Sequence, residues 1–134
     1  MQPARTWIVV ADSARARIFS TERRDEEWEL VESLEHPEGR AHTPELVTEM
    51  PALERGELPK EHETKVFARQ LARRLEGALH RHEYQRLVVV APPELMGHLR
   101  KALSPPVSAV VVDEITKDFS QLRQDDLEER LASW

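Results

Sequence analysis

The first decisive stretch of the sequence is TWIVVADSARARIFS (Thr6–Ser20), in which two apolar runs flank a polar centre. Thr6–Ala11 is short, apolar and rich in β-branched residues, so it predicts a buried strand. The polar centre, Asp12–Ala14, supplies the residue types that form turns. The run Arg15–Ser20 therefore predicts a second strand that pairs back on the first.

The remainder of the chain predicts a third strand, followed by helices that alternate with strands. The segment Trp28–Leu34 alternates, with Trp28, Leu30 and Glu32 on one face, and predicts the third strand. The downstream elements follow from helical periodicity or continuous apolar runs. They are a helix at Glu61–Glu83, a strand at Arg86–Ala91, a helix at Glu94–Leu103, a strand at Val107–Val112 and a helix near Gln121–Ala132.

The element order β-β-β-α-β-α-β-α predicts an α/β fold. An antiparallel start followed by strand–helix–strand crossovers gives a mixed sheet with helices packed on it. The length of 134 residues suits a single domain over residues 1–134. A long loop at about 36–60 interrupts this pattern, and it holds four of the nine prolines. Loops of this length inside a domain are often functional, so we expect partner contacts there.

Composition excludes several classes of protein. Cysteine is absent, which excludes disulfides, thiolate metal sites and cysteine nucleophiles. The longest apolar runs, Trp7–Ala11 and Leu87–Pro93, are too short to span a bilayer, and no signal-peptide segment is recognisable. We therefore expect a cytoplasmic protein without a membrane partner.

The net charge of −6 is unevenly distributed along the chain. Residues 25–59 carry two basic and eleven acidic side chains, a net −9, whereas residues 1–24 and 60–86 each carry a net +3. Because local patches decide phosphate contacts, the acidic total does not exclude a nucleic-acid partner.

Basic residues on the long predicted helix form the main candidate for nucleic-acid binding. Lys65, Arg69 and Arg73 are spaced by four residues and therefore form a ridge that could follow phosphates. The alternative is a solvated helix face, whose repulsion neighbouring glutamates relieve. Arg15 and Arg17 share one face of the second strand and would either extend this ridge or protect a sheet edge.

Catalytic and metal-binding patterns are weak. Asp12 and Asp113 each follow a predicted buried strand, and with Glu114 or Asp118 they could form a metal-dependent nuclease site. Asp12, however, also occupies a natural turn position, and the long helix supplies no further carboxylate to complete the set. No histidine pair has metal-ligand spacing, and phosphate-loop and dinucleotide motifs are absent. We therefore expect no catalytic residue, metal or cofactor, and no enzyme activity.

Several motifs together resemble one known family. They are WIVVADSARARIF (Trp7–Phe19), HPEGR (His36–Arg40), FARQLARRLEGAL (Phe67–Leu79), LVVVAPPELMGHLRKAL (Leu87–Leu103) and EITKDFS (Glu114–Ser120). In this order they resemble the bacterial host attachment protein family, proteins required for attachment to host cells. That family is similar in turn to the middle domain of archaeo-eukaryotic release factors and Pelota. The resemblance implies an RNase H-like α/β fold.

The resemblance also implies a function without peptidyl-tRNA hydrolysis. Release factors carry a Gly-Gly-Gln motif in the loop before the long helix, and here that loop has neither a Gly-Gly pair nor a glutamine. The loop also has Glu49–Leu53 where the family commonly has an Asp-Arg-Pro-Gly-Arg-like stretch. We therefore expect a non-enzymatic module that binds the ribosome or RNA. The loop residues expected to contact the partner are His36, Glu38, Gly39 and Arg40.

A second hypothesis is a protein–protein interaction module in surface attachment or signalling. In this alternative the acidic 25–59 segment meets a basic partner protein. A homodimer is also compatible with the sequence, since Trp28 and Trp134 could pack either in the core or in a dimer interface.

Overall fold

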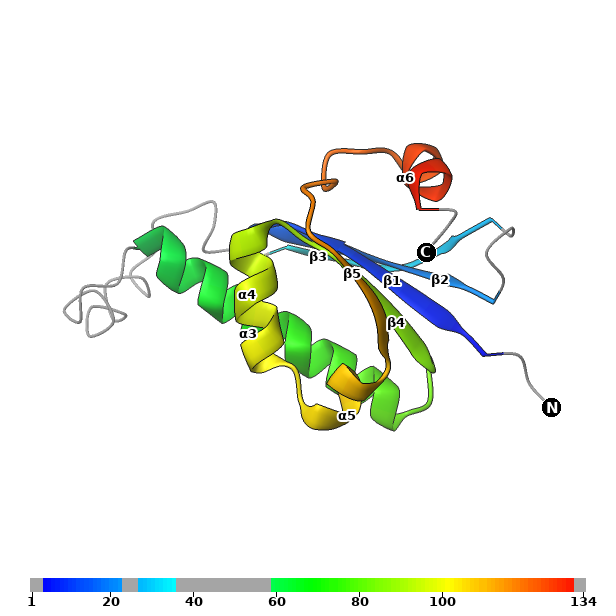
Figure 1. Cartoon of the computed structure of the whole chain (residues 1–134), viewed down its shortest axis with the longest axis horizontal. Helices are drawn as coiled ribbons and strands as arrows, with labels where there is room; N and C mark the ends of the chain where they lie inside the picture. Colours follow the sequence, from blue (N-terminus) through cyan, green and yellow to red (C-terminus); the bar gives the residue numbers. More distant parts are fainter. Residues whose placement is uncertain (1–3, 23–26, 36–58, 132–134) are drawn as a thin grey trace.

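A five-stranded sheet forms the centre of the protein (Figure 1). The computed structural model describes residues 4–22, 27–35 and 59–131. The strand order across the sheet is β3-β2-β1-β4-β5. The strands are β1 (Thr6–Ala11), β2 (Arg15–Thr21), β3 (Glu29–Glu35), β4 (Arg86–Val90) and β5 (Val111–Ile115). The helices are α3 (Pro59–His80), α4 (Pro93–Ala102), α5 (Pro105–Ala109) and α6 (Gln124–Arg130).

The sheet is mixed, as the sequence predicts. β1 pairs antiparallel with β2, and β2 pairs antiparallel with β3. On its other side β1 pairs parallel with β4, and β4 pairs parallel with β5. Parallel neighbours need crossover connections, and α3 and the α4–α5 pair supply them. The predicted α/β architecture with an antiparallel start is therefore confirmed.

The sheet separates two hydrophobic cores. Helices α3, α4 and α5 cover one face and α6 covers the other (Figure 1). Side chains alternate along β1, so Trp7 and Val9 pack under α3 and α4, whereas Ile8 and Val10 pack under α6. The β1 residues on both faces are almost completely buried, which explains why the segment reads as a continuous apolar run.

Helix α3 is fixed to the sheet along its predicted apolar face and by an aromatic contact. Phe67, Leu71 and Leu75 are buried against the sheet. Tyr84, after the helix, stacks on Trp7 with ring centroids 4.7 Å apart, and its hydroxyl donates a 2.7 Å hydrogen bond to the Leu75 carbonyl. Burial raises the pKa of Tyr84 well above its ordinary value, although the nearby Arg74 charge acts in the opposite direction.

The last strand lies further along the chain than predicted. The expected strand at Val107–Val112 is wrong, because Pro105–Ala109 forms the short helix α5 and β5 begins at Val111. Pro105 and Pro106 occupy the first helical positions, where a fixed φ and a missing N–H favour a helical turn. This local effect outweighs the strand propensity of the valines that follow.

A β-bulge changes the faces of the third strand. Ile18 pairs with Glu32 and Phe19 pairs with Leu30, so Val31 is the extra residue. Leu30 therefore shares the α6 face with Phe19, whereas Glu32 faces α3 and bonds Arg74 at 2.7 Å. The predicted placement of Leu30 and Glu32 on one face is wrong, because strict alternation does not survive a bulge.

The other element boundaries differ by a few residues from the predictions. The C-terminal helix α6 is shorter than the predicted Gln121–Ala132, since Thr116–Arg123 forms turns and bends before it. Helix α3 begins at Pro59, within the loop predicted at about 36–60. The remainder of that loop, residues 36–58, lies outside the described residues.

Candidate functional site

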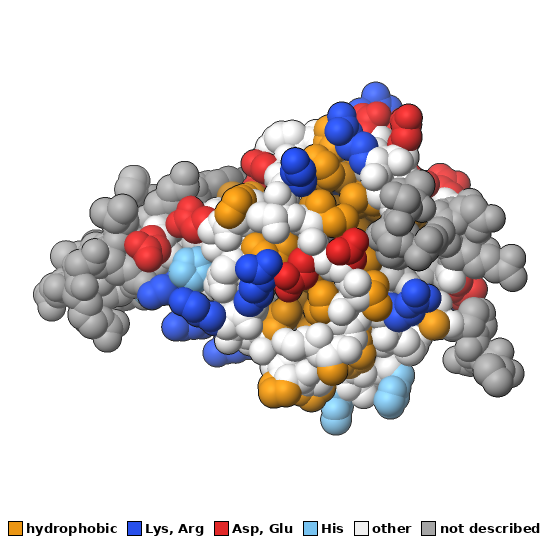
Figure 2. All heavy atoms as spheres, in the orientation of Figure 1, with side chains coloured by type: hydrophobic (Ala, Val, Ile, Leu, Met, Phe, Trp, Pro, Cys, Tyr) orange, Lys and Arg blue, Asp and Glu red, His pale blue; other side chains and the backbone are white. Residues whose placement is uncertain are grey.

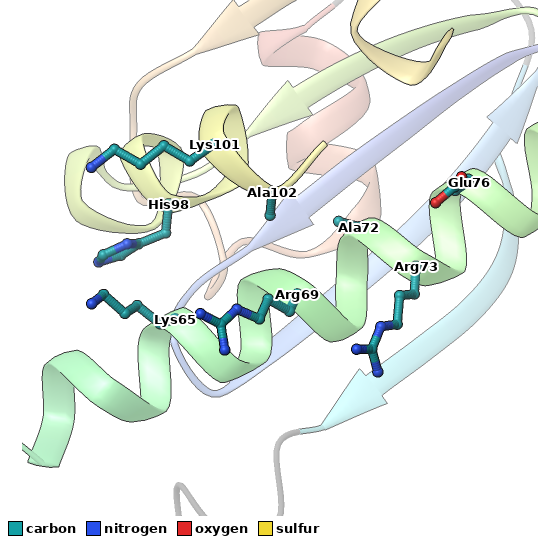
Figure 3. A pocket seen from close by; sticks show the side chains of 8 residues that line it. All are labelled: Lys65, Arg69, Ala72, Arg73, Glu76, His98, Lys101 and Ala102. Carbon is teal, nitrogen blue, oxygen red and sulfur yellow. The ribbon is translucent and has the colours of Figure 1, made fainter. Parts of the chain in front are cut away.

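A groove of about 440 Å³ lies between α3 and α4 (Figure 3). Helix α3 contributes most of its lining and the second half of α4 contributes the rest. The lining residues are Lys65, Arg69, Ala72, Arg73, Glu76, His98, Lys101 and Ala102. The predicted basic ridge thus forms one wall of a concave site.

The packing of α3 against α4 explains why the groove exists. The apolar side of α4, carrying Leu95, Met96 and Leu99, is buried against the sheet and α3. The helical period then turns His98 and Lys101 toward the groove. Ala72 and Ala102 line the groove with methyl groups, and such small side chains leave open the space that longer ones would fill.

The groove is strongly cationic. Five of its eight lining residues are lysine, arginine or histidine, and Glu76 is the only acid among them. Arg69, Arg73 and Lys101 are exposed and form no ion pair with any residue that the structure describes. Figure 2 shows lysine and arginine side chains gathered beside α3 and α4, toward the left of the view. The positive charge of Arg69, Arg73 and Lys101 attracts anions to the groove.

The charged side chains are arranged unevenly along the groove. In Figure 3 the side chains of Lys65, His98 and Lys101 gather at the end near the start of α3. Arg73 points away from α4, and Glu76 stands at the opposite end. The positive charge is therefore concentrated at the end of the groove near the start of α3.

Arg15 and Arg17 do not extend this groove. Arg17 lies on the α6 face of the sheet, where it donates a 3.0 Å hydrogen bond to the Ser120 carbonyl and packs over Phe19. Burial, with a smaller contribution from Arg15, lowers the pKa of Arg17. Arg15 is exposed two residues earlier on β2, and strand alternation places it on the same face as Arg17. The predicted patch is thus divided by the sheet.

The carboxylates considered for a nuclease site are used in other contacts or lie apart from the expected position. Asp12 Oδ1 accepts hydrogen bonds from the amides of Ala14 and Arg15, at 2.8 and 2.9 Å, which is the turn-forming role. Asp113 lies inside β5, paired with Val88, and does not follow the strand.

The two further acids of that set also have local partners. Glu114 bonds Arg100 at 2.8 Å, and Asp118 accepts a 2.7 Å hydrogen bond from Ser120. Within residues 4–22, 27–35 and 59–131, no three histidine or acidic side chains converge on a point that could hold a metal ion.

Sequence reasoning missed His98 and Lys101 as parts of the site. Both lie on the polar side of a helix that the sequence predicts correctly, three residues apart. Their spacing shows that they share a face, but it does not show which other helix that face meets. The expected loop contacts His36, Glu38, Gly39 and Arg40 lie outside the described residues.

No helix in the described part of the chain has both the length and the apolar character needed to cross a bilayer. This finding concerns the helices α3 to α6 alone.

Comparison with known proteins gives a family match and a fold match. A family model described as "Protein required for attachment to host cells" matches residues 7–131. No curated protein matches the chain. A crystal structure of an archaeal translation termination factor is similar, with a TM-score of 0.53 and 11% sequence identity. A second structure, titled "Archaeal protein", gives a TM-score of 0.52, also at 11% identity.

Each of these two matches covers 96% of this chain but 34% of the other, so the chain spans about a third of the length of either archaeal protein. At such low identity the likeness concerns the fold alone. It confirms the expected mixed α/β fold and its expected likeness to a release-factor structure.

Proposed function

The chain belongs to the family of proteins required for attachment to host cells, and on this premise we propose that it is a non-enzymatic, release-factor-like module that binds RNA on or near the ribosome. The proposed RNA-binding surface is the groove between α3 and α4.

The charge of that groove is the observation that carries the proposal. Arg69, Arg73 and Lys101 come from two helices, line the same groove and form no ion pair within the part of the chain that the structure describes. Arranging like charges in this way costs stability, and a bound polyanion would remove that cost. Phosphate contacts of this kind supply most of the affinity of proteins for nucleic acid.

The fold match supports the ribosome as the location of this RNA. The archaeal structure that resembles the chain is that of a translation termination factor, and 96% of this chain takes part in the match. The chain has no Gly-Gly pair anywhere in its sequence, so it lacks the Gly-Gly-Gln motif with which release factors assist hydrolysis. These two features together support binding without peptidyl-tRNA hydrolysis.

The hydrogen bonds of Asp12, one of the carboxylates considered for a nuclease site, support a structural role for this residue and not a catalytic one. Its Oδ1 atom is occupied by two backbone amides, which hold the turn between β1 and β2. If a nuclease activity were nevertheless measured, the variant Asp12→Asn would test whether that carboxylate takes part. Activity unchanged in that variant would exclude the proposed nuclease site.

Co-sedimentation with ribosomes over a salt series tests the proposal. We expect the protein in ribosomal fractions at low salt and its progressive release as salt rises, because phosphate contacts are screened. The triple variant Arg69→Ala, Arg73→Ala, Lys101→Ala should lower the affinity for RNA by about 100-fold at low salt, through the loss of three phosphate contacts.

A matched control comes from the opposite face of the sheet. Arg123 is 83% exposed and lies at the start of α6, so Arg123→Ala removes one positive charge far from the groove. This control should change the affinity by less than about twofold. Absence of the wild-type protein from ribosomal fractions at low salt, or equal affinities of the triple variant and the control, would refute the proposal.

Glu76 offers a gain-of-affinity test. It is exposed and is the only acid among the described residues that line the groove. The variant Glu76→Gln removes a charge that repels phosphate and should raise the affinity for RNA by about twofold to fivefold at low salt. A fluorescence anisotropy titration with wild-type protein as the reference measures this change, and a weakened affinity would contradict a phosphate site.

The exposed edge of the sheet favours the second candidate, a protein–protein interaction module. Leu30 is 50% exposed and Val31 is 39% exposed, and both lie on the edge strand β3. Edge strands with exposed apolar side chains are suited to pairing with another chain. A pull-down that recovers one protein after nuclease treatment, and that fails with Leu30→Lys, would favour this function.

A further inference from the structure

We infer that the α3–α4 groove binds the phosphate backbone of double-helical RNA and does not read unstacked bases. This inference rests on the proposed function, since it specifies which form of RNA the groove accepts. It follows from the side chains that the groove contains and from those that it lacks.

Proteins that bind single-stranded RNA stack its bases on aromatic side chains. The chain has three tryptophans, three phenylalanines and one tyrosine. Five of these seven side chains are exposed by 3% or less and lie in the two cores. They are Trp7, Phe19, Trp28, Phe67 and Tyr84.

The two remaining aromatic residues do not provide a described stacking surface at the groove. Phe119 packs against the α6 core, on the far side of the sheet, and Arg130 covers its ring at 5.6 Å. Trp134 lies outside the described residues. Among the described residues that line the groove there is no phenylalanine, tyrosine or tryptophan.

His98 is the one ring among the described residues that line the groove, and it is half-buried. A single imidazole provides one stacking surface, whereas single-strand sites use several rings for successive bases. The other described side chains that line the groove are lysine, arginine, alanine and glutamate, so within this set no side-chain amide or hydroxyl is available to read base edges. The groove thus offers charge with little means of recognising a base.

A row of positive charges along one helix suits a rigid polyanion. Residues four apart on a helix are displaced by about 6 Å along its axis, so Lys65, Arg69 and Arg73 form a row of about 12 Å. Lys101 adds charge from the opposite wall. Duplex nucleic acid carries about one charge per 1.7 Å, twice the density of one strand, and its phosphates are already held in place.

Base-paired RNA also removes the need for base contacts. The deep major groove of an A-form helix keeps base edges away from side chains, and proteins recognise such helices through shape and phosphates. A cationic concavity without stacking rings matches this mode of recognition. We therefore expect the protein to select structured RNA with little dependence on base sequence.

Fluorescence anisotropy with the full chain and defined probes tests the inference. Two RNA duplexes of equal length and unrelated sequence should bind with affinities within about twofold of each other. An unstructured single-stranded RNA with the same number of phosphates should bind at least about fivefold more weakly, because its charge density is lower. The slope of log affinity against log salt for the duplexes should be about −3 to −4, corresponding to four basic side chains.

A DNA duplex of the same length shows whether the groove prefers the phosphate backbone of RNA or that of DNA. Weaker binding to DNA than to RNA supports the inference, and tighter binding to DNA overturns the assignment to RNA. The double variant Arg69→Ala, Lys101→Ala should lower duplex affinity by about tenfold or more and reduce the salt slope by about 2. The control Arg123→Ala should retain the wild-type affinity and slope.

The possible failures can be told apart. Tighter binding to the single strand, or a difference above about tenfold between the two RNA duplexes, overturns this inference while the proposed RNA binding stands. Lack of binding to every RNA probe at low salt overturns the proposed function and this inference together.

Discussion

The two faces of the sheet use the same residue type in opposite ways. On the α3–α4 face Arg69 and Arg73 are exposed, line a groove and have no described ionic partner. On the α6 face Arg17 is half-buried and donates hydrogen bonds to the carbonyls of Phe119 and Ser120. An arginine whose donors are occupied by the backbone holds structure together, whereas arginines with open donors remain available for a ligand.

The faces also differ in how firmly their helices are held. Helix α3 spans Pro59–His80 and packs on the larger core with α4 and α5. Helix α6 spans Gln124–Arg130 and contributes Leu127 to the smaller core. Leu131, directly after the helix, belongs to the same core. A long helix that packs against other elements along its length cannot shift to fill a cavity as readily as a short helix can. We therefore regard the α3–α4 face as the rigid support of the candidate site.

The largest expected effect comes from removing one buried leucine on each face. Leu71 and Leu127 are both fully buried, so both lose the same transfer free energy on substitution. Leu71→Ala should cost about 4 to 5 kcal/mol, because α3 cannot collapse into the cavity, and Leu127→Ala about 2 to 3 kcal/mol. Urea unfolding of both variants measures the difference. Equal losses would show that the two faces are equally rigid.

A smaller effect is expected from removing the Arg17 hydrogen bonds. Arg17→Met keeps much of the side-chain volume but removes the donors to Phe119 and Ser120. We expect a loss of about 1 to 2 kcal/mol in the free energy of unfolding, and faster amide exchange in the segment before α6. RNA affinity should stay within about twofold of wild type, because Arg17 is outside the groove. A large loss of affinity would contradict the separation of roles.

The single tyrosine gives a pH-dependent test of the α3 face. Tyr84→Phe removes the hydrogen bond to the Leu75 carbonyl and should cost about 1 kcal/mol. Since burial raises the pKa of Tyr84, the folded state favours the neutral phenol. Its contribution is fully present below the unfolded pKa of about 10 and is lost progressively as the pH rises above that value.

Tyrosinate absorbance follows this titration without interference from a second tyrosine, because Tyr84 is the only one in the chain. The signal should rise together with unfolding as the pH increases. Ionisation near pH 10 in a protein that remains folded, as judged by far-UV circular dichroism, would be inconsistent with a buried phenol.

The smallest expected effect is a stabilisation of α4, which forms one wall of the groove. Gly97 lies inside α4, and a Cβ atom added there would meet no atom within 4 Å outside its chain neighbours and the nearby backbone of its own helix. Gly97→Ala should therefore raise the free energy of unfolding by about 0.5 to 1 kcal/mol, through a better helix propensity. Thermal unfolding measures this gain, and a destabilised variant would show that the outer surface of α4 is not open.

The regular elements could be predicted because their hydrophobic patterns agree with their final burial. β1 and β4 appear as continuous apolar runs since both faces of the sheet are covered, and α3 shows its buried residues at helical spacing. The errors arose where local geometry departs from a simple period. The bulge at Val31 shifted Glu32 to the other face, and Pro105 started a helical turn within an apparent strand.

The candidate site could be predicted only in part. The ridge of Lys65, Arg69 and Arg73 follows from spacing within one helix, which a sequence contains. Lys101 joins that ridge because α4 packs beside α3, and such a contact between distant segments has no local signal. For the same reason the sequence could not show that β2 presents Arg17 to the opposite side of the sheet.

The sequence by itself determined the order of the five strands and the three longer helices, the mixed α/β class and the basic face of helix α3, because each of these depends on the spacing of neighbouring residues. Only the tertiary structure decided that His98 and Lys101 complete a groove and that Arg17 is separated from it. Which charges share a surface depends on how helices pack across a sheet, and this packing is fixed by the burial of both hydrophobic cores together.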